Sequence, residues 1–228
     1  MTMSQEVKFV PDIPPQQQYL PPTPPSEPSS ELAKMTSHTN SSVLSSPSSL
    51  HKHIWVITGP AGCGKTSVAE FLHSTYSLPY LEGDTFHTPE NVEKMANGHP
   101  LTDADRWDWL VLLREEAIKA LKTSDGVIVT CSALKRKYRD VMRIAAYHHP
   151  EIRVHFVFLK ASEAVLMDRV RARQNHYMKD YMVRSQFESL EAPTEEESDV
   201  LAVDASGTSK EVQDLALATV EQEMKADA

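Results

Sequence analysis

The chain has 228 residues, a formal net charge of −9 and two cysteines. The acidic balance disfavours nucleic acid and anionic membrane as partners, since both require a positive field, and two cysteines are too few for a disulfide scaffold or a four-cysteine zinc site. The sequence has neither an apolar run of roughly 18 residues that would span a membrane nor the charged start and apolar run of a signal peptide, so we expect a cytoplasmic protein.

The first 50 residues differ in composition from the rest. Residues 1–50 hold none of the seven glycines, nine of the fifteen prolines and fifteen Ser or Thr. Such a segment cannot bury enough apolar surface to offset its chain entropy, so we predict a disordered extension. Its stretch PPTPPSEP could bind a proline-recognising module, or the extension could be inert and solvated. The extension has two Lys against four Asp or Glu, which leaves a formal charge of −7 for the single predicted domain, residues 51–228.

Short apolar runs alternate with helical patterns along this domain. The runs typical of buried strands are 54–58, 79–82, 127–131, 154–159 and 200–204. Helices are predicted from Thr88, from Thr102 with Asp105 as a capping box, after Ala133, from Ser162, over 181–190 and from Ser209. The alternation predicts an α/β fold, a three-layer α/β/α sandwich with a parallel sheet, whose ligands bind beyond the carboxyl ends of the strands.

The strongest motif is GPAGCGKT, which fits G-x-x-x-x-G-K-[ST] between a predicted strand and a predicted helix. The residues expected to bind the nucleotide are Gly59, Pro60, Ala61, Gly62, Cys63, Gly64, Lys65 and Thr66. Glycines let backbone N–H groups surround a phosphate, Lys65 reaches the β and γ phosphates, and the Thr66 hydroxyl binds Mg²⁺. The motif predicts a P-loop NTPase that uses ATP and Mg²⁺; the alternative is a glycine-rich turn with an exposed lysine.

Polar residues follow the second and third predicted strands. Asp84 ends the second strand in LEGDTFH, where its carboxylate could orient an attacking hydroxyl or accept its proton. Alternatively, Asp84 caps a turn or holds a magnesium-bound water. The basic stretch CSALKRKYRD follows the third strand, and its position favours contacts of Lys135 and Arg139 with a small anion. Read alone, KRKYR could also be a localisation or nucleic-acid patch.

A third cluster is RVRARQNHYMK, in which Arg169 and Arg173 lie at i, i+4 of a continuing helix. Like charges at this spacing cost an isolated helix about 0.2–0.5 kcal/mol, which indicates a bound anion. We predict a mobile lid over about residues 169–180, whose arginines neutralise charge during phosphoryl transfer; a solvated basic face is the alternative. Cys63 and Cys131 are expected to be packing residues, with a redox switch between them as the alternative.

Taken together, these residues resemble the gluconokinase family over nearly the whole of residues 51–204. The stretches that carry the resemblance are GPAGCGKT, LEGDTFHTPENVEKMANGHPLTDADRWDWL, CSALKRKYRD, HFVFLK, RARQNHYMK and QFESLEAP. The order G-D-x-x-H, K-M-x-x-G-x-P-L-x-D-x-D-R and C-S-A-L-K distinguishes it from nucleoside monophosphate and shikimate kinases with the same loop. The resemblance implies a nucleoside-monophosphate-kinase-like core, often a homodimer, that converts D-gluconate and ATP into 6-phosphogluconate and ADP with Mg²⁺ and feeds the pentose phosphate pathway.

By position in these motifs, the resemblance also implies roles for single residues. Those expected at the sugar acid are Asp84, His87, Arg106, Lys135, Arg139 and His176, and those expected in the lid are Arg169 and Arg173. The sequence departs from the family at Asp108, where proline is common, and at Gln174 and Asn175, where Lys and Gly are common. The alternatives are a kinase for another aldonate, a shikimate-like acid or a nucleotide, and a nucleotide-dependent switch or scaffold.

Overall fold

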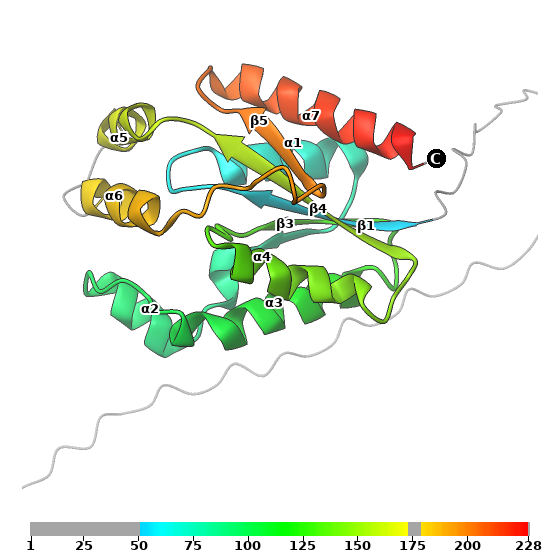
Figure 1. The fold of residues 1–228 in the computed structure, drawn as a ribbon, viewed down its shortest axis with the longest axis horizontal. Helices are drawn as coiled ribbons and strands as arrows, with labels where there is room; N and C mark the ends of the chain where they lie inside the picture. Colours follow the sequence, from blue (N-terminus) through cyan, green and yellow to red (C-terminus); the bar gives the residue numbers. More distant parts are fainter. Residues whose placement is uncertain (1–50, 173–178, 228) are drawn as a thin grey trace, which may run out of the picture. The chain divides into compact units, whose positions relative to one another are not determined.

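The computed structural model describes residues 51–172 and 179–227, coloured in Figure 1. Five parallel strands form one sheet in the order β2-β3-β1-β4-β5. The strands are β1 (Lys52–Thr58), β2 (Tyr80–Glu82), β3 (Gly126–Thr130), β4 (Ile152–Lys160) and β5 (Val200–Asp204). Each lies within two residues of its predicted bounds, because an apolar run that is mostly buried or half-buried marks each strand. The predicted disorder of residues 1–50 concerns a segment outside the described residues and stays a prediction.

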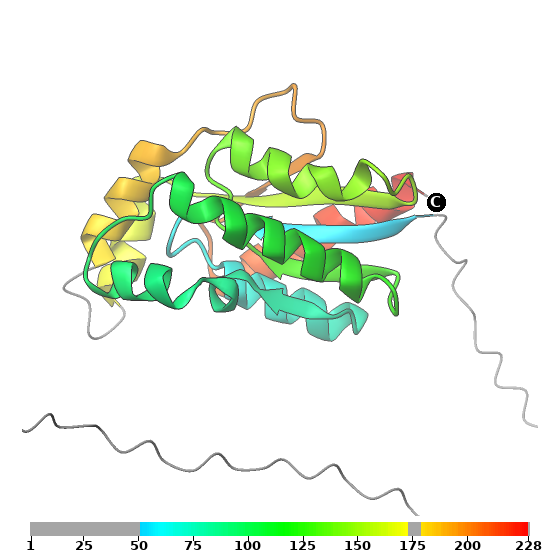
Figure 2. The same cartoon turned by 90° about the horizontal axis from the view of Figure 1, so that it is seen from below.

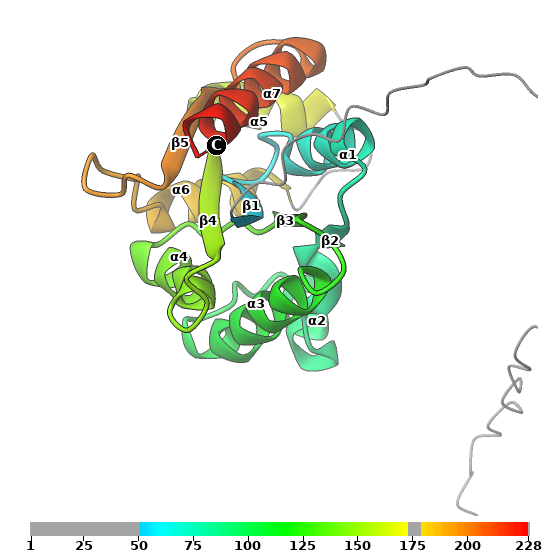
Figure 3. The same cartoon turned by 90° about the vertical axis from the view of Figure 1, so that its right-hand side faces the viewer.

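Helices cover both faces of the sheet. The α-helices are α1 (Lys65–Tyr76), α2 (Pro89–Ala96), α3 (Trp107–Ala120), α4 (Arg136–Arg143), α5 (Glu163–Ala172), α6 (Lys179–Ser189) and α7 (Ser209–Ala226), and the 3-10 turns are η1 (Gly83–Phe86), η2 (Ala104–Arg106) and η3 (Ile144–Ala146). Viewed from one end, α1 and α7 lie on one side of the sheet and α3 and α4 on the other (Figure 3). The turned view shows α3 and α4 side by side across their face (Figure 2). The fold is therefore the predicted three-layer α/β/α sandwich.

The central strand β1 shows why the sequence folds into layers. Its side chains alternate, so that Trp55 and Ile57 pack with α1, α5 and α7, whereas Ile54 and Val56 pack with α3 and α4. All four side chains are at most 2% exposed. Full burial of one aliphatic side chain such as Ile57 contributes about 1.5–3 kcal/mol, so both faces of β1 hold the two helical layers together.

The helix starts follow the local sequence, with one difference. Thr88 caps α2 as predicted, since its hydroxyl accepts a hydrogen bond from Asn91 N at 3.3 Å. The Thr102–Asp105 pair forms a hydrogen bond from Thr102 N to Asp105 Oδ2 at 2.6 Å, but η2 follows it and α3 begins only at Trp107. Among the described helices, none has the length and hydropathy of a membrane span.

Candidate active site

The predicted phosphate loop leaves the carboxyl end of β1 and enters α1. Gly59, Gly62 and Gly64 all have positive φ angles, of 138°, 84° and 102°. A Cβ on Gly59 would also lie 2.9 Å from Leu159 O, so only glycine fits there. The loop therefore needs its glycines for backbone conformation, which is the property that lets successive N–H groups converge on an anion.

Lys65 and Thr66 extend this loop towards two different neighbours. Lys65 Nζ donates to Gly59 O at 3.0 Å and to Pro60 O at 3.2 Å, which holds the cation across the mouth of the loop. Thr66 Oγ1 donates to Glu82 Oε2, at the end of β2, at 3.2 Å. The start of α1 thus lies beside the carboxyl end of β2.

Glu82 accepts hydrogen bonds from several hydroxyl groups at the carboxyl end of β2. Its carboxylate also accepts from Tyr80 OH and, at 2.5 Å, from Thr130 Oγ1. Burial and the hydrogen bond to Glu82 both raise the pKa of Tyr80, which therefore stays a donor. Hydroxyl and carboxylate oxygens are the ligands that Mg²⁺ prefers, so Thr66 and Glu82 fit a magnesium ion. The sequence signal for Glu82 was its place beside Asp84 at a strand end, but no metal role was predicted for it.

Asp84 and His87 lie on and just after the turn η1. Asp84 is exposed, whereas His87 is half-buried and stacks on Trp109 of α3 with the ring centroids 4.1 Å apart. Trp109 Nε1 also donates to Gly83 O at 2.7 Å, so α3 fixes the turn that carries Asp84. Burial lowers the pKa of His87, although Asp84 opposes this, and the imidazole is neutral at pH 7. Asp108 is exposed in the first turn of α3, where negative charge suits the helix dipole, so the departure from proline leaves that helix start intact.

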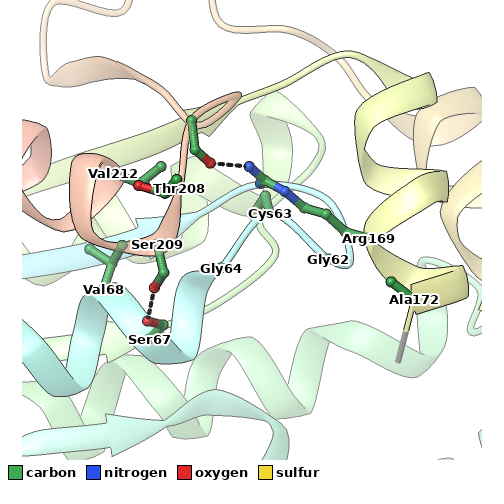
Figure 4. Close-up of a pocket in the computed structure, with 11 residues that line it drawn as sticks. Gly62, Cys63, Gly64, Ser67, Val68, Arg169, Ala172, Thr208, Ser209 and Val212 are labelled. Atoms are coloured by element: carbon green, nitrogen blue, oxygen red, sulfur yellow. Dashed lines mark hydrogen bonds between the residues drawn. The ribbon is translucent and has the colours of Figure 1, made fainter. Parts of the chain in front are cut away.

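One pocket lies between the phosphate loop, the end of α5 and the turn before α7 (Figure 4). Its volume is about 300 Å³, and its walls include Gly64, Val68, Arg169 and Val212. Arg169 Nη2 donates to Gly207 O at 2.5 Å, so this arginine reaches from α5 across to the turn before α7. Arg169 therefore lies next to the phosphate loop, and its role in a lid stays a prediction. Arg173 and His176, and residues 173–178 of the predicted lid as a whole, lie outside the described residues.

A second pocket, of about 110 Å³, lies between α2 with its following loop and the helix α6. Met95, residues 98–101 and Arg106 line one side, and Tyr181, Ser185 and Gln186 line the other. Arg106 Nη1 donates to Leu101 O and to Thr102 O, and its guanidinium lies 5.5 Å from the centre of the Tyr138 ring. This places a cation at the wall of a pocket on the α2 side of the site.

Comparisons with known proteins agree with this arrangement. A family described as an AAA domain matches residues 54–196. A "Probable gluconokinase" of Schizosaccharomyces pombe is 45% identical over 161 residues, which cover 67% of this chain and 80% of that protein. The thermoresistant gluconokinase of Escherichia coli K12 is 40% identical over 152 residues, 67% of this chain and 84% of that protein. The chain belongs to the gluconokinase family. A crystal structure of a gluconokinase from Sinorhizobium meliloti 1021 covers 78% of this chain and 95% of its own, with 38% identity and a TM-score of 0.68.

In this member of the gluconokinase family, the basic stretch after β3 is largely neutralised by acidic partners. Lys135 Nζ donates to Asp103 Oδ1 at 3.0 Å, and Lys137 and Tyr138 donate to the same carboxylate. These hydrogen bonds, with that of Lys137 the strongest, hold the pKa of Asp103 well below its usual range. Arg136 pairs with Glu196 at 3.0 Å. KRKYR is therefore not an open basic patch, which argues against the nucleic-acid interpretation.

Arg139 is placed differently from its expected contact with the sugar acid. Its side chain is 1% exposed and forms a two-pronged ion pair with Glu197, whose side chain is 2% exposed, at 2.6 and 2.7 Å. Its remaining N–H groups donate to Ala133 O, Leu134 O and Glu191 O. Because every guanidinium nitrogen is engaged within the protein, we assign Arg139 to the stability of the fold.

Replacing Arg139 should therefore cost stability and spare substrate binding. Its hydrogen bonds, and then those of Arg143, lower the pKa of Glu197 from 4.5 to about 2, so the pair contributes stability above pH 4.5 and loses it as the pH falls towards 2. Arg139→Met leaves part of a buried charge unpaired, and we expect the free energy of unfolding in urea at pH 7 to fall by about 3–5 kcal/mol.

Arg136→Met is the matched control, because its ion pair with Glu196 is 51% and 75% exposed and should contribute at most about 1 kcal/mol. Below the unfolding transition, both variants should keep the KM for gluconate of the unaltered protein. If Arg139→Met instead has normal stability and a KM for gluconate raised tenfold or more, Arg139 contacts the substrate and its assignment to fold stability is wrong.

Both cysteines are buried packing residues, as predicted. Cys63 is 1% exposed beneath the phosphate loop, and Cys131 is 2% exposed after β3. Burial raises the pKa of the Cys63 thiol and raises that of Cys131 to about 12. Both thiols are protonated at neutral pH, which is unfavourable for redox exchange because the thiolate is the reactive form.

Proposed function

We infer that the chain is a gluconokinase, which transfers the γ-phosphoryl group of ATP to D-gluconate and forms 6-phospho-D-gluconate and ADP. The observation that carries this inference is the hydrogen bond between Thr66 and Glu82. It brings the start of α1, where the phosphate loop ends, to the end of β2, only two residues from the exposed carboxylate of Asp84. The phosphate-binding loop and an acid that can face an alcohol thus lie at the same, carboxyl, end of the parallel strands.

The chemistry follows from this placement. Loop amides and Lys65 bind the phosphates of ATP, and Thr66 and Glu82 are the residues that would hold Mg²⁺, which when bound neutralises the β and γ oxygens. Asp84 orients the acceptor hydroxyl and takes its proton as the oxygen bonds to the γ phosphorus. The bond from that phosphorus to the β–γ bridging oxygen breaks, and ADP leaves. Most of the acceleration comes from positioning and electrostatic stabilisation.

The acceptor is a polyhydroxy carboxylate in this proposal, so it needs cationic and polar partners. Arg106 supplies positive charge on the α2 side, and Asp84 and His87 supply polar groups on the β2 side. Lys135 would have to exchange its ion pair with Asp103 for a contact with the acceptor. His87 Nδ1 is buried without a hydrogen-bond partner among the described residues, so a substrate hydroxyl would satisfy it. Arg173 and His176 stay predicted contacts.

A panel of acceptors tests the proposal. In a coupled assay of ADP release with ATP and Mg²⁺, we expect gluconate to give the highest kcat/KM among aldonates, shikimate and nucleoside monophosphates. Mass spectrometry should detect phosphorylated gluconate. Turnover of another acceptor with none for gluconate would make the protein a kinase of different specificity, and nucleotide binding without any turnover would favour a switch or scaffold.

Two finer parts of the proposal, a homodimeric state and the entry of the product into the pentose phosphate pathway, rest on the family resemblance alone. A cytoplasmic location rests on the sequence features given above and stays a proposal. A proline-recognising partner for residues 1–50 rests on the stretch PPTPPSEP alone. Sedimentation of the purified protein would test the dimer directly.

A further inference from the structure

One side chain of α6 contacts the phosphate loop directly. Gln186 Oε1 accepts a hydrogen bond from the backbone N–H of Ala61 at 2.7 Å. The two residues are 125 positions apart in the sequence, and the bond joins a helix that follows α5 to the loop that follows β1. Gln186 was not among the residues predicted to act in the site.

The backbone of α6 is held firmly enough to aim this side chain. Val183, one turn before Gln186, is fully buried in the core cluster that also contains Leu166 and Val170 of α5. Phe187, the next residue, packs against the same cluster. Figure 1 shows α5 and α6 side by side beyond the carboxyl end of the sheet. The approach of Gln186 to the loop is therefore set by packing of the helix.

Gln186 also lines the pocket between α2 and α6, opposite Arg106. It thus touches the donor side through Ala61 and the acceptor side through this pocket. A group that moves from the loop to an acceptor in this region has to lie between the two. Gln186 borders that path.

The two ends of the amide have different partners. The oxygen has to face Ala61, because a backbone N–H can only donate. The two N–H groups of Nε2 have no hydrogen-bond partner among the described residues, and the side chain is only half-buried. These donors lie in the same amide plane as the oxygen that is bonded to Ala61, a residue of the phosphate loop. Such donors suit a phosphoryl oxygen.

We propose that Gln186 is a catalytic residue that donates a hydrogen bond from Nε2 to the γ-phosphoryl group while its oxygen holds the loop at Ala61. This inference rests on the proposed kinase activity but not on the identity of the acceptor. ADP lacks the group that Nε2 contacts, so the amide distinguishes ATP from ADP at the phosphate loop.

Nucleotide affinity tests this without any acceptor. Gln186→Met removes both ends of the amide, and Gln186→Glu keeps the oxygen that faces Ala61 but replaces the donor with negative charge. We expect calorimetry with Mg²⁺ to show that each variant binds a non-hydrolysable ATP analogue at least about tenfold more weakly, because a hydrogen bond to a charged group is lost. Gln186→Glu should be the more impaired, because it also adds negative charge. In Gln186→Glu, which keeps the contact with Ala61, affinity for ADP should change less than about twofold. The value of kcat should fall at least about tenfold in both variants.

Glu188→Gln is the control, since Glu188 is exposed on the same helix, and it should match the unaltered protein throughout. Equal loss of ADP and analogue binding in Gln186→Met, with unaltered binding in Gln186→Glu, would overturn the proposal, because the oxygen alone would then matter. So would normal analogue binding in both variants. If the unaltered protein fails to phosphorylate gluconate while the analogue-selective loss persists, the proposed acceptor is wrong and the role of Gln186 stands.

Discussion

Lys65→Ala is expected to reduce turnover of gluconate by at least about 10³-fold, the scale seen when a phosphoryl-stabilising cation is removed. Lys65 Nζ lies 3.0 Å from Gly59 O, at the mouth of the loop, where it can move onto the β and γ phosphates of ATP. Truncation removes the cation of the loop, which would otherwise stabilise the negative charge that develops on the transferring phosphoryl group. The measurement is the rate of ADP release at saturating ATP and gluconate.

The fold should tolerate this change, because within residues 51–172 and 179–227 the Lys65 side chain hydrogen-bonds to two loop carbonyls and to no other group. The Tm should therefore stay close to that of the unaltered protein. Lys119→Ala is a matched control, since its side chain is 69% exposed on α3 and pairs with Glu116 on the same helix. Near-normal turnover in Lys65→Ala would exclude the phosphate loop as the donor site.

Asp84→Asn should lower kcat by about 10²–10⁴-fold, the range for loss of a general base. The substitution keeps the shape of the side chain but removes the charge that orients the acceptor hydroxyl and the site that takes its proton. The KM for ATP should change little, because the nucleotide contacts come from the loop and Arg169. Steady-state kinetics with ATP and gluconate varied in turn give both values.

Asp108→Asn is the control for Asp84→Asn, as both carboxylates are exposed but Asp108 lies in the first turn of α3 and not at the end of β2. It should retain normal kcat. If Asp84→Asn also keeps a normal kcat, Asp84 serves only the turn η1, and the proton acceptor has to be sought elsewhere.

The sequence was most informative where a requirement is local. The alternation of β1 and the glycines of the loop follow from neighbouring residues, and both predicted the structure closely. Arg139 had no such signal, because its partner Glu197 is 58 positions away in the sequence. A basic residue that follows a strand also looks like one that binds an anionic substrate. The acid Asp103 that neutralises Lys135 is similarly distant in sequence. Gln186 was missed because its contact with Ala61 depends on how α6 packs.

The position of each half of the site in the strand order has a consequence for how specificity can change. The phosphate loop follows β1, which has a neighbouring strand on both sides, whereas Asp84 follows β2, a short strand at the margin of the sheet. Backbone with fewer neighbours opens at lower free energy, so hydrogen exchange should be faster in β2 than in β1. Substitutions in the segment after β2 can therefore change which alcohol is accepted without disturbing the phosphate loop that binds the nucleotide.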